Sequence, residues 1–247
     1  MTTRYAGELS AGDRVPFKCS DRRYENEGNR AVLELLTSQP KEILDVGCGS
    51  GDNARLARDL GFDQQFCGIT ISRAEQQAAL AVMNHCWVAD LEKTDLGFLN
   101  GRKFDAILFS HVLEHLINPG AAVGRFLPFL RSGGRVIIAV PNVLVLKQRI
   151  KFLMGHFDYE EDGIMDSTHL RFYTYDSAAR SLIASPELRL IRKEVEGSVP
   201  LWFLRHHFLP ARAKAWLDKQ GCSLFPNLFG DQILLEARKI SIANAVG

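Results

Sequence analysis

A glycine-rich stretch contains the residues of this sequence whose spacing best suits ligand chemistry. The stretch reads Asp45-Val46-Gly47-Cys48-Gly49-Ser50-Gly51-Asp52 and follows a short apolar run. Glycines let the backbone turn sharply and approach a ligand closely. A helix that begins directly afterwards directs its free N–H groups at the same place. The pattern therefore predicts a ligand-binding turn between a buried strand and a helix.

The spacing of these glycines discriminates between classes of cofactor. A dinucleotide site requires G-x-G-x-x-G, but after Gly47 and Gly49 the third position is occupied by Asp52, and Gly51 comes one residue early. An NAD site also requires an acidic residue at the end of the next strand, where this sequence has Thr70. A nicotinamide oxidoreductase therefore stays only as a disfavoured alternative.

Strands and helices that alternate along the chain would position this turn. The pattern predicts strands over 42–46, 65–70, 86–89, 104–109 and 135–140, and helices over 29–36, 52–60, 73–83 and 121–130. Ser72 is the expected N-cap of the third helix, and the turn Ser132-Gly133-Gly134 closes the fourth. Such alternation is typical of a doubly wound parallel sheet, with ligand-binding loops at one edge.

The pattern changes after Pro141. Residues 142–175 are rich in aromatic, histidine and charged residues, and we expect them to form an insertion after the fifth strand. A helix over 176–184, a strand over 188–195, an irregular stretch over 197–230 and a last strand over 231–237 complete the chain. With residues 1–26 as an N-terminal arm, the whole chain 1–247 is predicted to be a single domain.

The glycine stretch, D-x-G-x-G-x-G, resembles motif I of class I S-adenosylmethionine-dependent methyltransferases. "FDAI" at 104–107 with "VLEHL" at 112–116 resembles their fourth-strand motif, and "LRSGGRVIIAV" at 130–140 their fifth strand. The resemblance implies a Rossmann-like, mostly parallel seven-stranded sheet of order 3-2-1-4-5-7-6 with an antiparallel seventh strand. It also implies S-adenosylmethionine as the cofactor.

The resemblance further implies which residues line the cofactor site. Asp45 would orient the loop near the methionine moiety, and Asp90 would accept a hydrogen bond from the adenine amino group, with Leu91 beside the ring. Ser110 and His111 would lie near the sulfonium. The full predicted set is Asp45, Gly47, Cys48, Gly49, Gly51, Thr70, Ile71, Gln76, Asp90, Leu91, Ser110 and His111.

Thr70 is a departure from the family pattern, which usually places there an acidic residue that binds both ribose hydroxyls. Similar G-I-T-x-S segments occur in the cyclopropane-synthase-like branch, where a nearby glutamine helps to hold the ribose. Glu75 or Gln76, one turn into the following helix, could take that role, and Gln76 is the predicted one. Removing the Thr70 hydroxyl is expected to weaken cofactor binding.

The sequence His111-x-x-Glu114-His115 matches a zinc-protease pattern, H-x-x-E-H. We disfavour that function, because such enzymes place the helix in a different fold with a further ligand. Related O-methyltransferases carry E-x-x-E-H here and bind a divalent cation, and His111 would favour zinc-like ligation. The alternative is that Glu114 and His115 fix the loop by hydrogen bonds, and we predict no metal.

The segment "GIMDSTHLRFYT" at 163–174 resembles one found in methyltransferases of glycan or other small-molecule biosynthesis. Asp166 and Arg171 are the predicted acceptor-binding residues, and His115 and His169 are the candidate general bases, because an oxygen acceptor must lose a proton. The alternative is that His169 and Arg171 only clamp the insertion onto the core.

The composition limits the partners. A net charge of +1 argues against nucleic acid, no apolar run is long enough for an integral membrane contact, and five widely spaced cysteines without a CxxC pair suit the cytoplasm. A polar and aromatic cluster could form a lid or acceptor pocket, but packing or homodimer contact is favoured; it comprises Trp202, Phe203, Arg205, His206, His207 and Phe208.

The predicted function is therefore methylation of a small-molecule acceptor with S-adenosylmethionine. O-methylation of a sugar or glycan precursor is the preferred form. The alternative is a catalytically idle protein of the same fold that binds the cofactor or regulates a partner, because an intact binding loop argues for binding and not for turnover.

Overall fold

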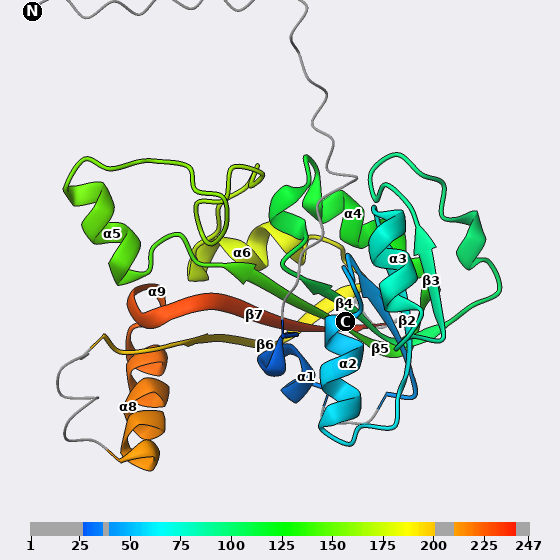
Figure 1. Ribbon diagram of the computed structural model, residues 1–247, viewed down its shortest axis with the longest axis horizontal. Helices are drawn as coiled ribbons and strands as arrows, with labels where there is room; N and C mark the ends of the chain where they lie inside the picture. Colours follow the sequence, from blue (N-terminus) through cyan, green and yellow to red (C-terminus); the bar gives the residue numbers. More distant parts are fainter. Residues whose placement is uncertain (1–26, 37–39, 201–209, 241–247) are drawn as a thin grey trace, which may run out of the picture.

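A computed structural model of the chain describes residues 27–36, 40–200 and 210–240. Its strands are β1 (Glu42–Val46), β2 (Gln65–Thr70), β3 (His85–Val88), β4 (Phe104–Ser110), β5 (Leu130–Pro141), β6 (Leu188–Gly197) and β7 (Gly230–Lys239). Together they form a seven-stranded sheet of order β3-β2-β1-β4-β5-β7-β6 (Figure 1). β1 to β5 pair in parallel, and β7 is antiparallel to both of its neighbours. The predicted order and the antiparallel seventh strand are confirmed.

The helices of the described part of the chain are α1 (Arg30–Glu34), α2 (Asp52–Asp59), α3 (Arg73–Ala79), α4 (Pro119–Phe126), α5 (Leu146–Leu153), α6 (Tyr175–Leu182), α8 (Ala211–Leu224) and α9 (Pro226–Phe229). Short 3-10 helices are η2 (Gly97–Leu99), η3 (Leu113–His115) and η4 (Leu127–Phe129). In this part of the chain, no helix has the length and apolar character that a membrane crossing requires.

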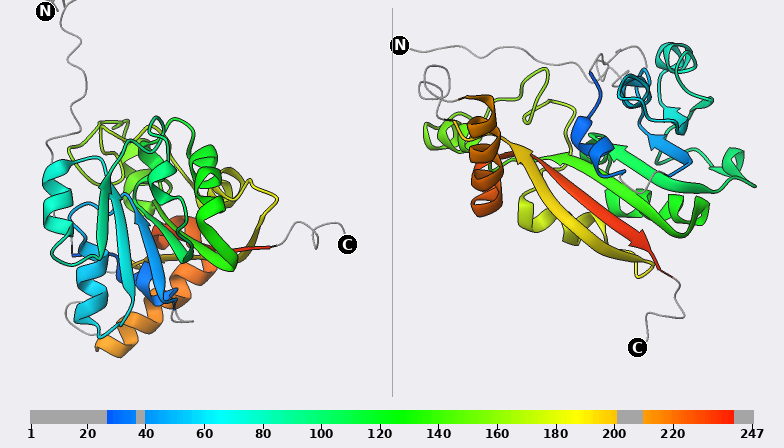
Figure 2. Two further views of the ribbon diagram at one scale, coloured as in Figure 1. Left: turned by 90° about the vertical axis from the view of Figure 1, so that its right-hand side faces the viewer. Right: turned by 90° about the horizontal axis from the view of Figure 1, so that it is seen from below.

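Helices cover both faces of the sheet (Figure 2). Side chains of α1, α2 and α3 join one apolar cluster, and side chains of α4 and α6 join another. Neighbouring residues of β4 alternate between the two, with Ile107 and Phe109 in one cluster and Ala106 and Leu108 in the other. Burial on both faces explains why the central strands are continuously apolar.

Two predicted boundaries around the fourth helix are wrong. The helix expected over 121–130 ends at Phe126 and continues as η4, because Pro128 has no N–H for the helical ladder. β5 then begins at Leu130, so the turn expected at 132–134 lies inside that strand. The pairing of β5 with β4 shifts register between Phe104 and Ala106, which are paired with Leu130 and Arg135. Gly133 and Gly134 lie in the part of β5 between these two pairs.

The expectation that residues 197–230 are irregular is also wrong. This stretch contains α8 and α9, and the insertion at 142–175 contains α5. The three helices lie at the end of β6 and β7 that is remote from α2 and α3 (Figure 1). The apolar residues of α8 do not form one buried face, since Trp216 and Leu224 are exposed while Cys222 is buried. Its sequence therefore lacks the helical apolar period that predicts a helix. The predicted arm 1–26 and the cluster at 202–208 lie outside the described residues.

An ion pair is buried where β5, β7 and the end of α1 meet. Arg135 Nη1 donates to Glu236 Oε1 at 3.0 Å and to the Leu35 carbonyl at 2.9 Å. The two side chains are only 7% and 8% exposed. The direct hydrogen bond between the two charges is what makes them tolerable at this depth, although Arg135 Nη2 has no partner among the described residues.

We expect Arg135→Met to lower the free energy of unfolding by about 3 kcal/mol, because it leaves the Glu236 carboxylate buried without its main partner. The double variant Arg135→Met/Glu236→Met should be more stable than that single variant. Denaturant titration of the three proteins measures both differences. A double variant that is less stable than Arg135→Met would contradict this account.

Candidate functional site

The loop between β1 and α2 is built on three glycines in the left-handed region. Gly47, Gly49 and Gly51 have φ of +79°, +51° and +83°. A Cβ on Gly47 would lie 2.5 Å from Val112 Cγ2, and a Cβ on Gly51 would lie 2.8 Å from Val82 Cγ2. A Cβ on Gly49 would meet nothing within 4 Å. The loop is therefore packed at both ends and open at Gly49.

The side chain of Cys48 points from this loop into the core. Its Sγ lies 3.7 Å from Cys86 Sγ, and both thiols are buried and free. Gly68 of β2 makes room for it, since a Cβ there would lie 2.5 Å from Cys48 Sγ. Cys48, which was predicted to contact the cofactor, can therefore do so only through its backbone atoms, because its side chain is buried in the core.

Three buried polar atoms around the loop have no hydrogen-bond partner among the described residues: Asp45 Oδ1, Ser50 Oγ and Asp52 Oδ2. In addition, no side chain caps the N-terminus of α2. Buried polar groups are normally paired, and a helix N-terminus favours an acceptor or an anion. The loop therefore suits a ligand that brings both hydrogen-bond donors and a carboxylate.

Asp45 is the most perturbed acid of the loop. Its complete burial raises its pKa from 3.8 to about 7. A hydrogen bond from Asn53 Nδ2 at 3.0 Å works against this rise, and the nearby charge of Asp52 adds to it. A positively charged ligand group beside Asp45 would offset the burial and favour the carboxylate.

The end of β2 carries a carboxylate that comes from the following helix. Thr70 Oγ1 donates to Glu75 Oε2 at 2.5 Å, and both residues are buried. Ser72 caps α3 as predicted, accepting from Glu75 N. Gln76 Nε2 instead donates to the Cys86 carbonyl on β3 at 2.7 Å. Glu75 thus lies beside Thr70, where the family pattern has its acid, and Gln76 lies toward β3. The intervening Ile71 is exposed.

Asp90 follows β3 and is held in a fixed orientation. Its Oδ1 accepts from Glu92 N at 2.9 Å and from Lys93 N at 3.2 Å. Partial burial on its own raises the pKa of Asp90, but these donors and the Lys93 ammonium hold it below the usual value. The Asp90 side chain remains 34% exposed, and the adjacent Leu91 is buried. Asp90 therefore presents an oriented acceptor beside an apolar surface.

His111, directly after β4, has a φ of +53°, the one positive value at a non-glycine residue in the described ranges. Its Nε2 lies 2.9 Å from Gln232 Oε1, and its Nδ1 lies 3.3 Å from Glu114 Oε1. Loss of solvent lowers the pKa of His111, but Glu114 and Gln232 raise it above its usual value. Ser110, the preceding residue, accepts from Asn29 Nδ2 at 3.4 Å.

The sequence after His111 does not form the helix that a zinc-protease pattern requires. Leu113–His115 is the three-residue 3-10 helix η3. Its Glu114 is 1% exposed, and the His169 Nε2 lies 3.9 Å from Glu114 Oε1. The rings of His115 and His169 meet edge-on with centroids 4.7 Å apart. The structure therefore brings together both predicted general bases, from segments about fifty residues apart.

The segment 163–171 is tied to η3 by backbone and side-chain hydrogen bonds. Leu170 N and Arg171 N both donate to the Glu114 carbonyl, at 2.9 and 3.0 Å. Arg171 Nη2 donates to the Ile117 carbonyl at 2.7 Å. These contacts are those of the clamp hypothesis. An acceptor-binding role for Arg171 and Asp166 stays a prediction.

Sequence reasoning missed Thr168, which links the two halves of this region. Thr168 Oγ1 donates to Asp166 Oδ1 at 2.6 Å and lies 2.9 Å from His115 Nδ1. Partial burial raises the pKa of Asp166, but the Thr168 hydrogen bonds and the two histidines bring it below the usual value. The Asp-x-Thr-His spacing at 166–169 can be seen in the sequence, but the contact of Thr168 with His115 cannot, because it is made by tertiary packing.

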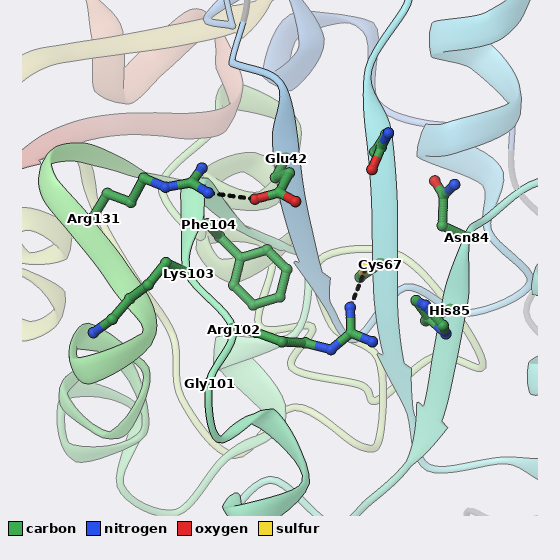
Figure 3. A pocket seen from close by; sticks show the side chains of 10 residues that line it. Glu42, Cys67, Asn84, His85, Gly101, Arg102, Lys103, Phe104 and Arg131 are labelled. Carbon is green, nitrogen blue, oxygen red and sulfur yellow. Dashed lines mark hydrogen bonds and ion pairs between the residues drawn. The ribbon is translucent and has the colours of Figure 1, made fainter.

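A pocket at the opposite edge of the sheet is distinct from this site (Figure 3). It is lined by the first residues of four strands, Glu42, Gln65, His85 and Phe104. Its Arg131 is already paired with Glu42 at 2.5 Å and with Asp105 at 2.6 Å. Loops after the carboxyl ends of the strands form the ligand-binding edge in open α/β sheets, so this pocket is not part of the candidate site.

Comparison with known proteins identifies the family to which the chain is similar. A sequence profile described as a methyltransferase domain matches residues 20–182. O-methyltransferase cnsE from Penicillium expansum is 30% identical over 115 residues, which cover 43% of this chain and 40% of that protein. The match thus spans less than half of the length of this relative.

Solved structures share the fold. A SAM dependent methyltransferase from Archaeoglobus fulgidus is similar with a TM-score of 0.58 and 18% identity, over 85% of this chain and 92% of that one. The plantazolicin methyltransferase BpumL, in complex with a monoazolic desmethylPZN analog and SAH, is similar with a TM-score of 0.53 and 17% identity, over 85% and 80%.

The raised pKa of Asp45 makes stability depend on pH in the absence of ligand. The unfolded chain loses this proton near pH 3.8 and the folded chain near pH 7, so the stabilising contribution is complete below pH 3.8 and is lost as pH rises toward 7. Since one pKa unit corresponds to about 1.4 kcal/mol, the loss amounts to about 4 kcal/mol.

Asp45→Asn should remove this dependence and be more stable than the natural chain at pH 8. Urea unfolding between pH 4 and pH 8 measures it. Asp59→Asn, on the exposed part of α2, is the matched control and should keep the original profile. Parallel profiles for the natural chain and Asp45→Asn would contradict the assignment.

Proposed function

The chain belongs to the methyltransferase domain family, and on this premise we propose that it transfers a methyl group from S-adenosylmethionine to an oxygen atom of a small-molecule acceptor. The observation that carries the proposal is the glycine loop, open at Gly49 and surrounded by buried polar atoms that lack partners. S-adenosylmethionine supplies an electrophilic methyl group on a sulfonium, and the chain must bind, orient and exclude water.

The residues of the loop fit the two charged ends of an amino-acid moiety. The carboxyl of Asp45 can accept from an ammonium, and the uncapped α2 N-terminus can bind a carboxylate. The Thr70–Glu75 pair supplies oxygen atoms for ribose hydroxyls at the end of β2. Asp90 offers an acceptor for an adenine amino group, and Leu91 offers apolar surface for the ring.

An oxygen acceptor is the class that the neighbouring histidines support best. Transfer to a hydroxyl requires removal of its proton, and imidazole is suited to this at neutral pH. The rings of His115 and His169 are in contact, and the turn that carries His115 begins next to Val112, which packs on Gly47 of the glycine loop. The O-methyltransferase cnsE, similar over part of its length, supports the same class. A sugar or glycan precursor is the first acceptor that we propose to test.

Binding of S-adenosylmethionine and its demethylated product, measured by calorimetry, tests the cofactor site. We expect micromolar affinity for both. Gly49→Val should abolish binding, because its side chain fills the open side of the loop, and Asp90→Ala should weaken binding about tenfold, the usual effect of losing one charge-assisted hydrogen bond. His156→Ala, on an exposed loop, is the control. A natural chain that binds neither compound would refute the proposal.

The acid at the ribose position can be tested with neighbouring variants. Glu75→Gln is expected to weaken the affinity about tenfold, because a carboxylate accepts from ribose hydroxyls more strongly than an amide does. Thr70→Val should weaken it as well, since Thr70 orients Glu75. Gln76→Ala is the comparison, as its amide is bound to β3. A larger loss for Gln76→Ala than for Glu75→Gln would assign the ribose contact to Gln76.

A further inference from the structure

Three side chains with metal-binding atoms converge beside the end of β4. One ligand atom from each of Glu114, His115 and His169 lies within 4.8 Å of the others. Two of the three residues are buried and His115 is half-buried. We propose that these residues form a binding site for a divalent transition-metal ion.

The first argument is the state of the Glu114 carboxylate. It is 1% exposed, and neither of its oxygens has a hydrogen-bond partner among the described residues. Its ion-pair contacts among the described residues are long, to His111 Nδ1 at 3.3 Å and to His169 Nε2 at 3.9 Å, and both reach Oε1. A carboxylate at this depth without a hydrogen bond is unfavourable. A cation held between Glu114 and the histidines would satisfy it.

The second argument is the orientation of the His169 ring. Its Nδ1 lies 3.0 Å from the Ile164 carbonyl oxygen. A carbonyl only accepts hydrogen bonds, so Nδ1 carries a proton, and in the neutral ring Nε2 carries the lone pair. Nε2 is the atom that lies nearest to Glu114. The neutral His169 ring therefore points a lone pair at the carboxylate, and a cation between them would be bound by both groups.

His115 is held in the same tautomer by different partners. The Thr168 hydroxyl donates its hydrogen to Asp166 Oδ1 at 2.6 Å, so its oxygen accepts from His115 Nδ1 at 2.9 Å. The lone pair of His115 is then on Nε2. Both rings are thus fixed through Nδ1 by a carbonyl or a carboxylate-backed hydroxyl, the outer-shell arrangement typical of metal-binding histidines. This assigns Asp166 to the support of His115.

The set differs from the one considered from the sequence, in which His111 was the third ligand. Gln232 Nε2 donates to Glu196, so Gln232 Oε1 faces His111 Nε2 as an acceptor. His111 is therefore held at the edge of the group, and His169, from a distant segment, completes it. Two imidazoles and one carboxylate favour zinc-like ions over magnesium. Three protein ligands also leave a coordination position open, as in catalytic zinc sites.

The site is adjacent to the glycine loop, since Val112, between His111 and η3, packs on Gly47. An acceptor hydroxyl bound at the open coordination position would lose its proton more readily than in water. The ion would then promote ionisation of the hydroxyl in place of a histidine general base, and the released proton would pass to solvent water. This consequence depends on the proposed function, whereas metal binding by the three residues does not.

Metal titration of the full chain tests the site directly. The protein is treated with a chelator, dialysed and titrated with Co²⁺ by visible absorption, with Zn²⁺ by competition against a chromophoric chelator, and with Mg²⁺. We expect one Co²⁺ or Zn²⁺ per chain at micromolar or tighter affinity and much weaker Mg²⁺ binding. Glu114→Gln and His169→Ala should weaken Zn²⁺ binding at least about tenfold, as should Thr168→Val, which removes the support of His115.

His156→Ala is the matched control, because its exposed side chain has Nδ1 at 3.8 Å from Asp158 Oδ2 and is not one of the three clustered residues. It should bind Zn²⁺ like the natural chain. Thermal melts without metal establish that each variant is folded, and Glu114→Gln keeps the side-chain shape. The site would be overturned if the natural chain did not bind Zn²⁺. It would also be overturned if Glu114→Gln and His169→Ala bound Zn²⁺ as tightly as the natural chain.

Parallel calorimetry with S-adenosylhomocysteine separates this inference from the proposed function. Metal binding without binding of this compound upholds the site and refutes the cofactor assignment. Binding of this compound without metal binding overturns the site and leaves the cofactor assignment intact.

Discussion

The register between β1 and β4 is the constraint on which the rest of the site depends. Val46 pairs with Phe109 in parallel, so both strands end at the same level and their loops leave the sheet side by side. Val112 then packs directly on Gly47. A slip of one residue would reverse the faces of the strand that slips and would separate the glycine loop from the turn that carries Glu114. Ligand binding and the acceptor side therefore share one structural origin.

The site keeps polar groups unpaired in places where a folded protein usually pairs them. Asp45, Ser50 and Asp52 each have a side-chain oxygen without a hydrogen-bond partner at the glycine loop. Both carboxylate oxygens of Glu114, after the neighbouring strand β4, lack one as well. Left-handed backbone at His111 adds an uncommon conformation between them. The surrounding sheet, apolar on both faces, supplies the stability that tolerates these features. They are concentrated at one edge of the sheet, the edge at which open α/β folds bind ligands.

The sequence was most informative where the signal is local. β1 and β2 match their predicted bounds, because short apolar runs between glycines and polar residues leave little freedom. The glycine spacing identified the loop. It could not show that Glu75 faces Thr70 while Gln76 faces β3, since adjacent helical positions differ by about 100° in direction. Nor could it pair His115 with His169, because that contact is made by tertiary packing. α8 escaped detection because its apolar residues are largely exposed.

The burial of Asp45 links ligand binding to protons. With a pKa near 7, the ligand-free loop is a mixture of neutral and charged forms around neutral pH. A cationic ligand group selects the charged form, so binding near neutrality expels a fraction of a proton. The apparent affinity for such a ligand therefore increases as pH rises toward the pKa and levels off above it. The buffer takes up the released proton. The heat measured on binding therefore includes the heat of buffer protonation and depends on which buffer is used.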